Sequence, residues 1–348
     1  MVTVTPLLAV HPSNGYNAIM EKAEAFAQSA ALIEMCRKEL AKRIVGQREM
    51  IDGLLTAFIA GGHILLEGVP GLAKTLAVKS LAEIIGLEFK RIQFTPDLLP
   101  ADLTGTLIWD QAKGSFTVRR GPIFANVILA DEINRAPAKM QSALLEAMEE
   151  RQVTIGETSY PLPDPFFVLA TENPIEHEGT YPLPEAELDR FLLKLLVTYP
   201  SPEEELAVIA RSPSLSSGGR DPGEPLSAVL DGRTIAMLRE AADLIHIDEK
   251  ICEYIVSIVC ATRPAAVSAG NIYRYISFGA SPRASIALHR CSRILALFSG
   301  KDFVGPEEVK KAAYPVLRHR IVLSYEAEAD GLDADKVISR ILSHVPVP

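Results

Sequence analysis

The chain has 348 residues, of which 48% are hydrophobic and 23% are charged, and its net charge is −9. This balance suits a globular protein with a sizeable core and about two domains. The negative charge makes non-specific wrapping of nucleic acid unfavourable, because such binding needs a basic surface. The composition therefore argues against a nucleic-acid partner.

The sequence predicts neither a membrane span nor a secretory signal. Its longest apolar stretch, 54–66, contains two glycines and a histidine and is shorter than the ~18 residues that a spanning helix needs. Residues 1–17 lack a charged segment followed by a long apolar one. The four cysteines have no metal-like spacing, and buried thiols are expected. We therefore expect a soluble, cytoplasmic protein.

The first half of the chain begins with helices and then changes period. After a loose lead-in over 1–16, helix-forming residues predict helices over 18–43 and 48–60. A short apolar run, 63–67, is ended by glycine, and a helical pattern resumes at Lys74. A buried strand, a glycine-rich turn and a helix are the beginning of a βαβ unit.

Further short apolar runs predict a parallel sheet. The runs 127–130 and 166–170 do not alternate, which is typical of parallel strands covered on both faces. A helix with charges on one side is expected between them, over 139–150. The stretches 106–120 and 152–161 each have a glycine where a turn is needed, and we predict a β-hairpin for each.

The chain changes character after Tyr199. A helix is predicted over 203–210, and 212–225 is rich in serine, glycine and proline, as linkers are. From residue 228 onward every segment is predicted to be helical, over 233–246, 248–262, 281–299 and 306–317.

The predicted fold is therefore an α/β P-loop domain with a parallel sheet between helices, followed by a smaller all-α lid domain. We expect a lead-in and helix over 1–33, the nucleotide-binding domain over 34–200, a linker over 201–227 and the lid over 228–348.

A phosphate-binding loop follows the first predicted strand. Gly68-Val69-Pro70-Gly71-Leu72-Ala73-Lys74-Thr75 matches the P-loop pattern except at Ala73, where the pattern has glycine. Such a loop points backbone N–H groups at phosphate, and the next helix adds its positive end. Lys74 would reach the β- and γ-phosphates, and Thr75 would ligate Mg²⁺. Ala73 is expected to adopt helical angles at little cost.

Polar residues follow the two later strands. Asp131 and Glu132 come directly after 127–130, where Asp131 could hold Mg²⁺ and Glu132 could act as the general base. Such a pair also caps helices in many proteins. The catalytic assignment therefore depends on its position after a P-loop. Asn173 follows 166–170, and its amide could bond the attacking water or the γ-phosphate, although Asn before Pro is also a common turn.

Two arginines are candidates for the γ-phosphate. Arg190 precedes the apolar run 192–197, and Arg283 opens the helix predicted over 281–299. By position alone, each also fits an ordinary surface or salt-bridged arginine, as most arginines are.

Taken together, these motifs resemble the MoxR family of AAA+ ATPases, in the helix-2-insert group that also holds the magnesium-chelatase ATPase subunit. The resemblance runs from about Glu34 to Arg340 and includes the alanine in the P-loop. It makes 129–135 the Walker B segment, and it implies that Thr75 and Asp131 hold the metal. The residues it implies for nucleotide binding are Val45, Gly46, Gln47, Gly68, Val69, Pro70, Gly71, Leu72, Ala73, Lys74, Thr75 and Leu76.

The resemblance also implies the catalytic residues, which are Lys74, Glu132, Asn173, Arg190 and Arg283. Asn173 falls at sensor 1, and Arg190 falls at the arginine finger that reaches the ATP of the next subunit. Arg283 falls at sensor 2, which closes the lid on its own nucleotide. Arg318-His319-Arg320 resembles a recurrent family segment, for which no role follows from the sequence.

The implied function is ATP hydrolysis with Mg²⁺ by a homo-oligomeric ring, expected to be a hexamer, that remodels or matures a partner complex as a chaperone does. The two hairpins would project toward the pore or face of the ring and engage a client. A von Willebrand factor A domain protein is an expected partner from the resemblance alone. The sequence identifies neither the client nor the process.

Two other functions stay open. A nucleic-acid motor would show salt-dependent ATPase stimulation by DNA. A non-hydrolysing nucleotide switch could lose Glu132 without penalty, so the presence of Glu132 together with Lys74, Asp131, Asn173 and Arg190 favours hydrolysis.

Overall fold

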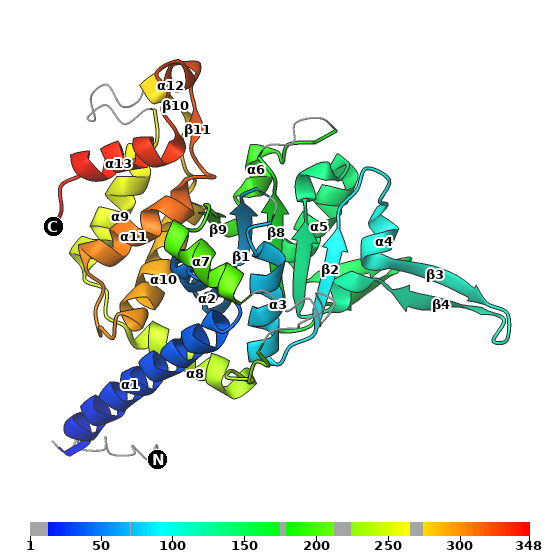
Figure 1. Ribbon diagram of the computed structural model, residues 1–348, viewed down its shortest axis with the longest axis horizontal. Coiled ribbons are helices and arrows are strands. Elements are labelled where there is room, and N and C mark those ends of the chain that lie inside the picture. Colours follow the sequence, from blue (N-terminus) through cyan, green and yellow to red (C-terminus); the bar gives the residue numbers. More distant parts are fainter. Residues whose placement is uncertain (1–12, 70, 175–178, 212–223, 265–273) are drawn as a thin grey trace, which may run out of the picture.

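The computed structural model describes residues 13–69, 71–174, 179–211, 224–264 and 274–348. Three parts of the predictions lie outside these ranges, namely most of the lead-in (1–12), Pro70 of the P-loop and most of the linker (212–223). A sheet flanked by helices lies beside a second, mainly helical region (Figure 1).

The centre of the molecule is a five-stranded parallel sheet with the order β2-β5-β8-β1-β9. Its strands are β1 (His63–Glu67), β2 (Phe89–Gln93), β5 (Val127–Asp131), β8 (Phe167–Glu172) and β9 (Phe191–Leu196). The predicted strands β1, β5 and β8 are the three central ones, and their side chains are almost all buried. The predicted parallel α/β fold is confirmed.

Helices cover the sheet and extend from it. They are α1 (Ser13–Ala41), α2 (Arg48–Ile59), α3 (Lys74–Ile85) and α5 (Ala138–Glu150), with the short α4 (Pro100–Thr104), α6 (Glu185–Leu188) and α7 (Pro202–Ala210). Single 3₁₀ turns are η1 (Pro122–Phe124) and η2 (Ile133–Arg135). Because α5 begins just past the carboxyl end of β5 and runs back along the sheet, its last turn lies near the amino ends of the strands.

Both predicted hairpins are present. The longer one pairs β3 (Gly105–Asp110) with β4 (Ser115–Arg120), and it projects far from the body of the molecule (Figure 1). The shorter one pairs β6 (Gln152–Ile155) with β7 (Thr158–Pro161). Trp109 and Phe116 face each other across the longer hairpin and are both more than half exposed.

The second region contains the four predicted helices, α8 (Gly232–Leu244), α9 (Glu249–Ala261), α10 (Pro282–Phe298) and α11 (Pro306–Leu317), followed by α12 (Tyr325–Ala329) and α13 (Ala334–His344). The expectation that every segment here is helical is wrong. β10 (Ile276–Phe278) pairs antiparallel with β11 (Val322–Leu323). Strands of two or three residues are too short to carry a periodic signal.

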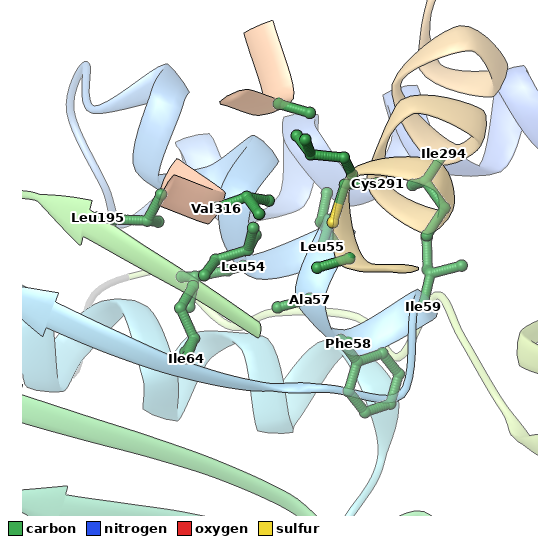
Figure 2. Close-up of a cluster of buried hydrophobic side chains, with 14 of the residues drawn as sticks. Leu54, Leu55, Ala57, Phe58, Ile59, Ile64, Leu195, Cys291, Ile294 and Val316 are labelled. Atoms are coloured by element: carbon green, nitrogen blue, oxygen red, sulfur yellow. The ribbon is translucent and has the colours of Figure 1, made fainter. Parts of the chain in front are cut away.

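The lid packs onto the sheet through a shared hydrophobic core. Leu54 of α2 and Ile64 of β1 belong to the same buried cluster as Cys291 and Ile294 of α10 and Val316 of α11 (Figure 2). Pulling the lid away would expose these side chains at a cost of roughly 1.5–3 kcal/mol for each large one. The lid is therefore held on the sheet by packing as well as by the chain connection.

Candidate nucleotide site

The P-loop lies at the carboxyl end of β1. The Gly68 amide donates to the carbonyl of Glu172 at 3.2 Å, and a Cβ at Gly68 would lie 2.8 Å from the carbonyl oxygen of Val197. Glycine is therefore required here by a close backbone approach. The ammonium of Lys74 donates to the carbonyl oxygens of Gly68 and Glu172. Burial lowers the pKa of Lys74, while the nearby carboxylates of Asp131 and others oppose this shift.

The expectation for Ala73 is wrong. Its backbone is left-handed, with φ 56°, and helical geometry begins only at Lys74. The residue before Lys74 still belongs to the loop, which has to turn there before the helix starts. An L-residue in this conformation costs roughly 1–2 kcal/mol, so the alanine is a strained substitute for glycine. Gly71, with φ +88° and open space around it, carries no such strain.

Asp131 ends β5 and is held by two neighbouring strands. Thr171 of β8 donates its hydroxyl to Oδ1 of Asp131 at 2.6 Å. Arg91 of β2 donates to Oδ2 through Nη2 at 2.7 Å and through Nε at 3.0 Å. The carboxylate is buried and fixed in direction, which suits a group that acts on a cation.

Glu132 follows immediately and has the left-handed φ of 57°. Its amide donates to the Thr171 hydroxyl at 2.8 Å, so one threonine joins both acidic residues. Gln93 donates to Oε2 of Glu132 at 2.7 Å, and Arg135 forms an ion pair with Oε2 at 3.2 Å. The sequence did not predict the contacts from Arg91 and Gln93, because their strand was not predicted.

Asn173 lies one residue beyond β8 and is buried. The preceding Glu172 is also largely buried, which raises the pKa of its carboxyl, and Lys194 opposes this shift. Lys194 forms an ion pair with Glu67 at 2.5 Å. The carboxyl ends of β1, β8 and β9 thus bring a compact polar cluster to the edge of the P-loop.

The motif over Val45–Gln47 is brought to the same end of the sheet. Gln47 donates its amide to the carbonyl of Thr198 at 2.9 Å, and Thr198 follows Val197, which packs on Gly68. Gly46 has φ +63°, and a Cβ there would overlap the carboxylate of Glu204 on α7.

These residues fit ATP with Mg²⁺. The first turn of α3, which includes Thr75 and Leu76, has no side-chain cap at Ala73, so its N–H groups are available to phosphate. Among the residues that the structure describes, the Thr75 hydroxyl has no hydrogen-bond partner, and no cluster of three or more His, Cys, Asp or Glu side chains could hold a metal ion alone. A cation here would share phosphate oxygens, as Mg²⁺ commonly does.

The two candidate arginines lie at the opposite end of the sheet. Arg190 precedes β9, whose first residue pairs with His63 at the start of β1. The P-loop follows the other end of β1, which is roughly 13 Å away for five residues of strand. Arg283 lies beside Arg190, because both donate to the carboxylate of Glu149, at 2.7 Å from Arg190 and 2.8 Å from Arg283. The expected position of Arg283 at its own nucleotide is therefore not what the structure shows.

A basic cavity of about 280 Å³ lies at this end of the sheet. The acidic residues that line it are Glu149 and Asp189, and the arginines that line it are Arg151, Arg190, Arg283, Arg290 and Arg320. A cavity with this charge balance favours an anionic ligand.

The segment Arg318-His319-Arg320 has a clear structural role. β9 is an edge strand, and its outward carbonyl groups need partners. Arg318 donates to the carbonyl of Lys194 at 2.9 Å, and His319 bonds the carbonyl of Phe191 at 3.0 Å. Arg320 donates to Phe191 and Leu192 at 2.6 and 3.1 Å. The segment therefore closes the edge of the sheet with lid side chains.

Two expectations concern the rest of the chain. The cysteines are free; Cys36 and Cys291 are buried, which raises each thiol pKa to about 12, whereas Cys252 and Cys260 are only partly buried. Within the described ranges, no helix is both long enough and apolar enough to cross a membrane.

The sheet order, the P-loop, the acidic pair and the packed helical lid define a P-loop ATPase of the AAA+ class. Residues 63–193 match the family model described as ATPase family associated with various cellular activities (AAA), and residues 269–341 match the AAA lid domain. A crystal structure of a candidate ATPase from Cytophaga hutchinsonii superposes with a TM-score of 0.86 at 47% identity, covering 96% of this chain and 99% of that one.

Curated relatives place the chain within one family of this class. Chaperone MoxR1 of Mycobacterium tuberculosis is 46% identical over 327 residues, which cover 94% of this chain and 85% of that protein. Protein MoxR of Methylorubrum extorquens is 30% identical over 325 residues, which cover 89% of this chain and 94% of that protein. The chain belongs to the MoxR family of AAA+ ATPases.

Proposed function

We propose that this chain hydrolyses ATP with Mg²⁺ in a ring of identical subunits and uses the cycle to remodel or mature a partner protein complex. The observation that carries the proposal is the separation of the P-loop from Arg190 and Arg283 along the length of β1. An arginine side chain cannot bridge roughly 13 Å of strand. The phosphate that these arginines contact would therefore belong to a neighbouring copy.

Head-to-tail contact of identical subunits supplies that arrangement. The carboxyl end of one sheet would face the amino end of the next, and repetition of such a contact closes a ring when the rotation allows it. The basic cavity beside Arg190 supports this reading, since a bound triphosphate is strongly anionic. A ring of six is the prediction from the family resemblance.

Within one subunit, the groups at the carboxyl end divide the chemistry. Lys74 and the first turn of α3 hold the phosphates, and Thr75 and Asp131 hold the Mg²⁺ shell. Mg²⁺·ATP supplies the phosphoanhydride bond and the cation that neutralises its charge. Glu132 accepts the proton of the attacking water, and Asn173 orients that water. An arginine supplied in trans contributes a rate factor of ~10³–10⁵ in related systems.

The remodelling role rests on the family. The Mycobacterium tuberculosis relative is named a chaperone, which supports a partner protein as the object of the cycle. The longer hairpin, with Trp109 and Phe116 exposed, is suited to contact that partner. A von Willebrand factor A domain partner and a cytoplasmic location stay predictions, as do the domain boundaries at 34–200 and 228–348.

The test is the ATPase rate measured against protein concentration in the presence of Mg²⁺, with sedimentation of the same samples with and without nucleotide. A specific activity that rises steeply with concentration, together with a nucleotide-dependent oligomer, supports the proposal. A constant specific activity from a monomer contradicts it. Tight ATP binding without turnover, under conditions that form the oligomer, favours the nucleotide switch instead.

A further inference from the structure

Glu149, in the last turn of α5, joins the two arginines. Its Oε2 accepts from Nε of Arg190 at 2.7 Å, and its Oε1 accepts from Nη2 of Arg283 at 2.8 Å. One carboxylate thus connects the segment before β9 to the first turn of α10. The two arginines that it joins are 93 positions apart in the chain.

Both guanidinium groups keep donors for a second anion. Arg190 binds Glu149 through Nε, and its Nη1 makes only a 3.9 Å contact with Glu187. Arg283 binds Glu149 through Nη2, and its side chain is half exposed. Because a guanidinium has five donors in a fixed plane, a hydrogen bond at one position orients the others. Glu149 therefore fixes the direction of the donors that remain.

A second acidic residue fixes the backbone beside this pair. Asp189 accepts from the hydroxyl of Ser281 at 2.8 Å and from Nε of Arg320 at 2.6 Å. Ser281 is the N-cap of α10 and also accepts from the Arg283 amide at 3.1 Å. The hydrogen bonds of Asp189 thus hold the start of α10 next to Arg190. The backbone segments that carry the two arginines are therefore fixed relative to each other.

Charge also favours a carboxylate between them. Arg190 and Arg283 approach the same group, and without it two cations would face each other in a cavity already lined by Arg151, Arg290 and Arg320. Hydrogen bonds from Arg190, which has the larger effect, and from Arg283 hold the pKa of the Glu149 carboxyl below its usual range. The carboxyl is therefore ionised at neutral pH.

We propose that Glu149 is a positioning residue that holds Arg190 and Arg283 of one subunit as a single paired donor for the γ-phosphate bound by the neighbouring subunit. The inference rests on the proposed function, because it needs arginines that act in trans. It adds that the two arginines act together and that neither is correctly placed without Glu149. The carboxylate stays with the arginines and does not compete with the phosphate for them.

The test compares Glu149→Gln with Glu150→Gln. Glu150 is the next residue on the same helix and is exposed, and its carboxylate has no hydrogen-bond or ion-pair partner among the described residues. Its variant therefore removes the same charge without breaking a contact. We expect Glu149→Gln to lower kcat by about 10- to 100-fold, as a displaced catalytic group does. ATP affinity of the subunit's own P-loop should be unchanged, and Glu150→Gln should behave as the wild type.

Assembly gives a readout that does not depend on turnover. With a non-hydrolysable ATP analogue, sedimentation should show that Glu149→Gln assembles only at about tenfold higher protein concentration, because the trans contact costs more to form when the arginines are not aligned. Mixing Glu149→Gln with Glu132→Gln protein should restore turnover, because the second protein offers intact arginines to the intact P-loop of the first. A defect in folding alone would not follow this pattern.

The outcomes separate the two proposals. If the wild type turns over in a concentration-dependent way and Glu149→Gln matches Glu150→Gln in rate and assembly, this inference is overturned and the proposed function stands. A faster Glu149→Gln would also overturn it, since the carboxylate would then restrain the arginines. Should Glu149→Gln unfold at lower temperature, Glu149→Asp, which keeps the charge but is too short to bridge both arginines, is expected to show the same loss in kcat and assembly.

Discussion

The two ends of the central sheet are built in different ways. The carboxyl end is assembled from residues that directly follow β1, β5 and β8, so each functional group lies within a few positions of a buried strand. The amino end is assembled from segments far apart in the sequence, namely the end of α5, the start of α10 and the segment before β9, closed by Arg320. Under the proposed function, each end carries part of what hydrolysis needs, so a single subunit is expected to be insufficient.

The largest expected effect comes from removing the finger. Arg190→Ala should lower the ATPase rate by ~10³-fold or more, because the transition-state charge loses its trans donor. Nucleotide binding to the subunit's own P-loop should stay near the wild-type value, which fluorescent ATP titration would measure. Arg233→Ala, at an exposed arginine in α8, is the control. Normal turnover by Arg190→Ala would mean that Arg190 takes no part in catalysis.

A large effect on stability is expected at the same end of the sheet. Arg320 is almost fully buried and bonds Asp189 and the carbonyls of β9. Arg320→Met leaves the Asp189 carboxylate without its charged partner, and the free energy of unfolding should fall by about 3–5 kcal/mol. Urea unfolding measures the change, and Arg320→Met combined with Asp189→Leu should recover part of it. Equal stability of wild type and Arg320→Met would show that the edge of β9 does not depend on the lid.

Acid should weaken the amino end through His63. Burial, with a smaller contribution from Arg151, lowers the pKa of His63 from 6.5 to about 3. Its Nδ1 accepts a hydrogen bond from the Val168 amide at 3.0 Å, so protonation of Nδ1 would place two N–H donors against each other. Because the folded-state pKa is depressed, the unfolded chain binds more protons between these values, and stability falls as pH drops below 6.5. The loss from this group between pH 7 and pH 5 is about 2 kcal/mol.

Thermal or urea unfolding at both pH values measures this loss. His63→Gln, whose amide can both donate and accept but does not titrate, should have a smaller pH dependence than the wild type. Parallel pH profiles for the two proteins would contradict the assignment to His63.

The smallest effect is expected in the P-loop. Ala73→Gly removes left-handed strain and should raise the free energy of unfolding by up to about 1 kcal/mol. Ala77→Gly, inside α3, is the control and should lower it by about 1–2 kcal/mol, because it loses helix propensity and a buried methyl group. A destabilised Ala73→Gly protein would show that the backbone at Ala73 is not strained.

The carboxyl end could be predicted from sequence because its motifs are local. The apolar runs of β1, β5 and β8 predict buried strands, and the residues after each strand meet at one edge. β2 was missed because it is an edge strand with Lys90, Arg91 and Gln93 exposed, and the contact of Arg91 with Asp131 was missed with it. The sequence signal of β2 is weak, because the strand is a short run of mixed polar and apolar residues between two helical stretches.

The amino end could not be predicted in the same way. The position of Arg283 depends on how α10 packs against the sheet, which is set by long-range contacts such as those of Cys291 and Ile294 with α2. Glu149 lies in a helix whose charged face is typical of any surface helix. Its significance appears only when the two arginines are brought to it in three dimensions.

The most direct test of the central claim is ATP turnover in an equal mixture of Arg190→Ala and Glu132→Gln proteins. Each protein alone is predicted to be inactive, the first for lack of a finger and the second for lack of a general base. In mixed assemblies, the intact P-loop of an Arg190→Ala subunit meets the intact arginine of a Glu132→Gln neighbour, so turnover should return. A mixture that forms joint oligomers yet stays as inactive as either protein alone would contradict a site shared between subunits.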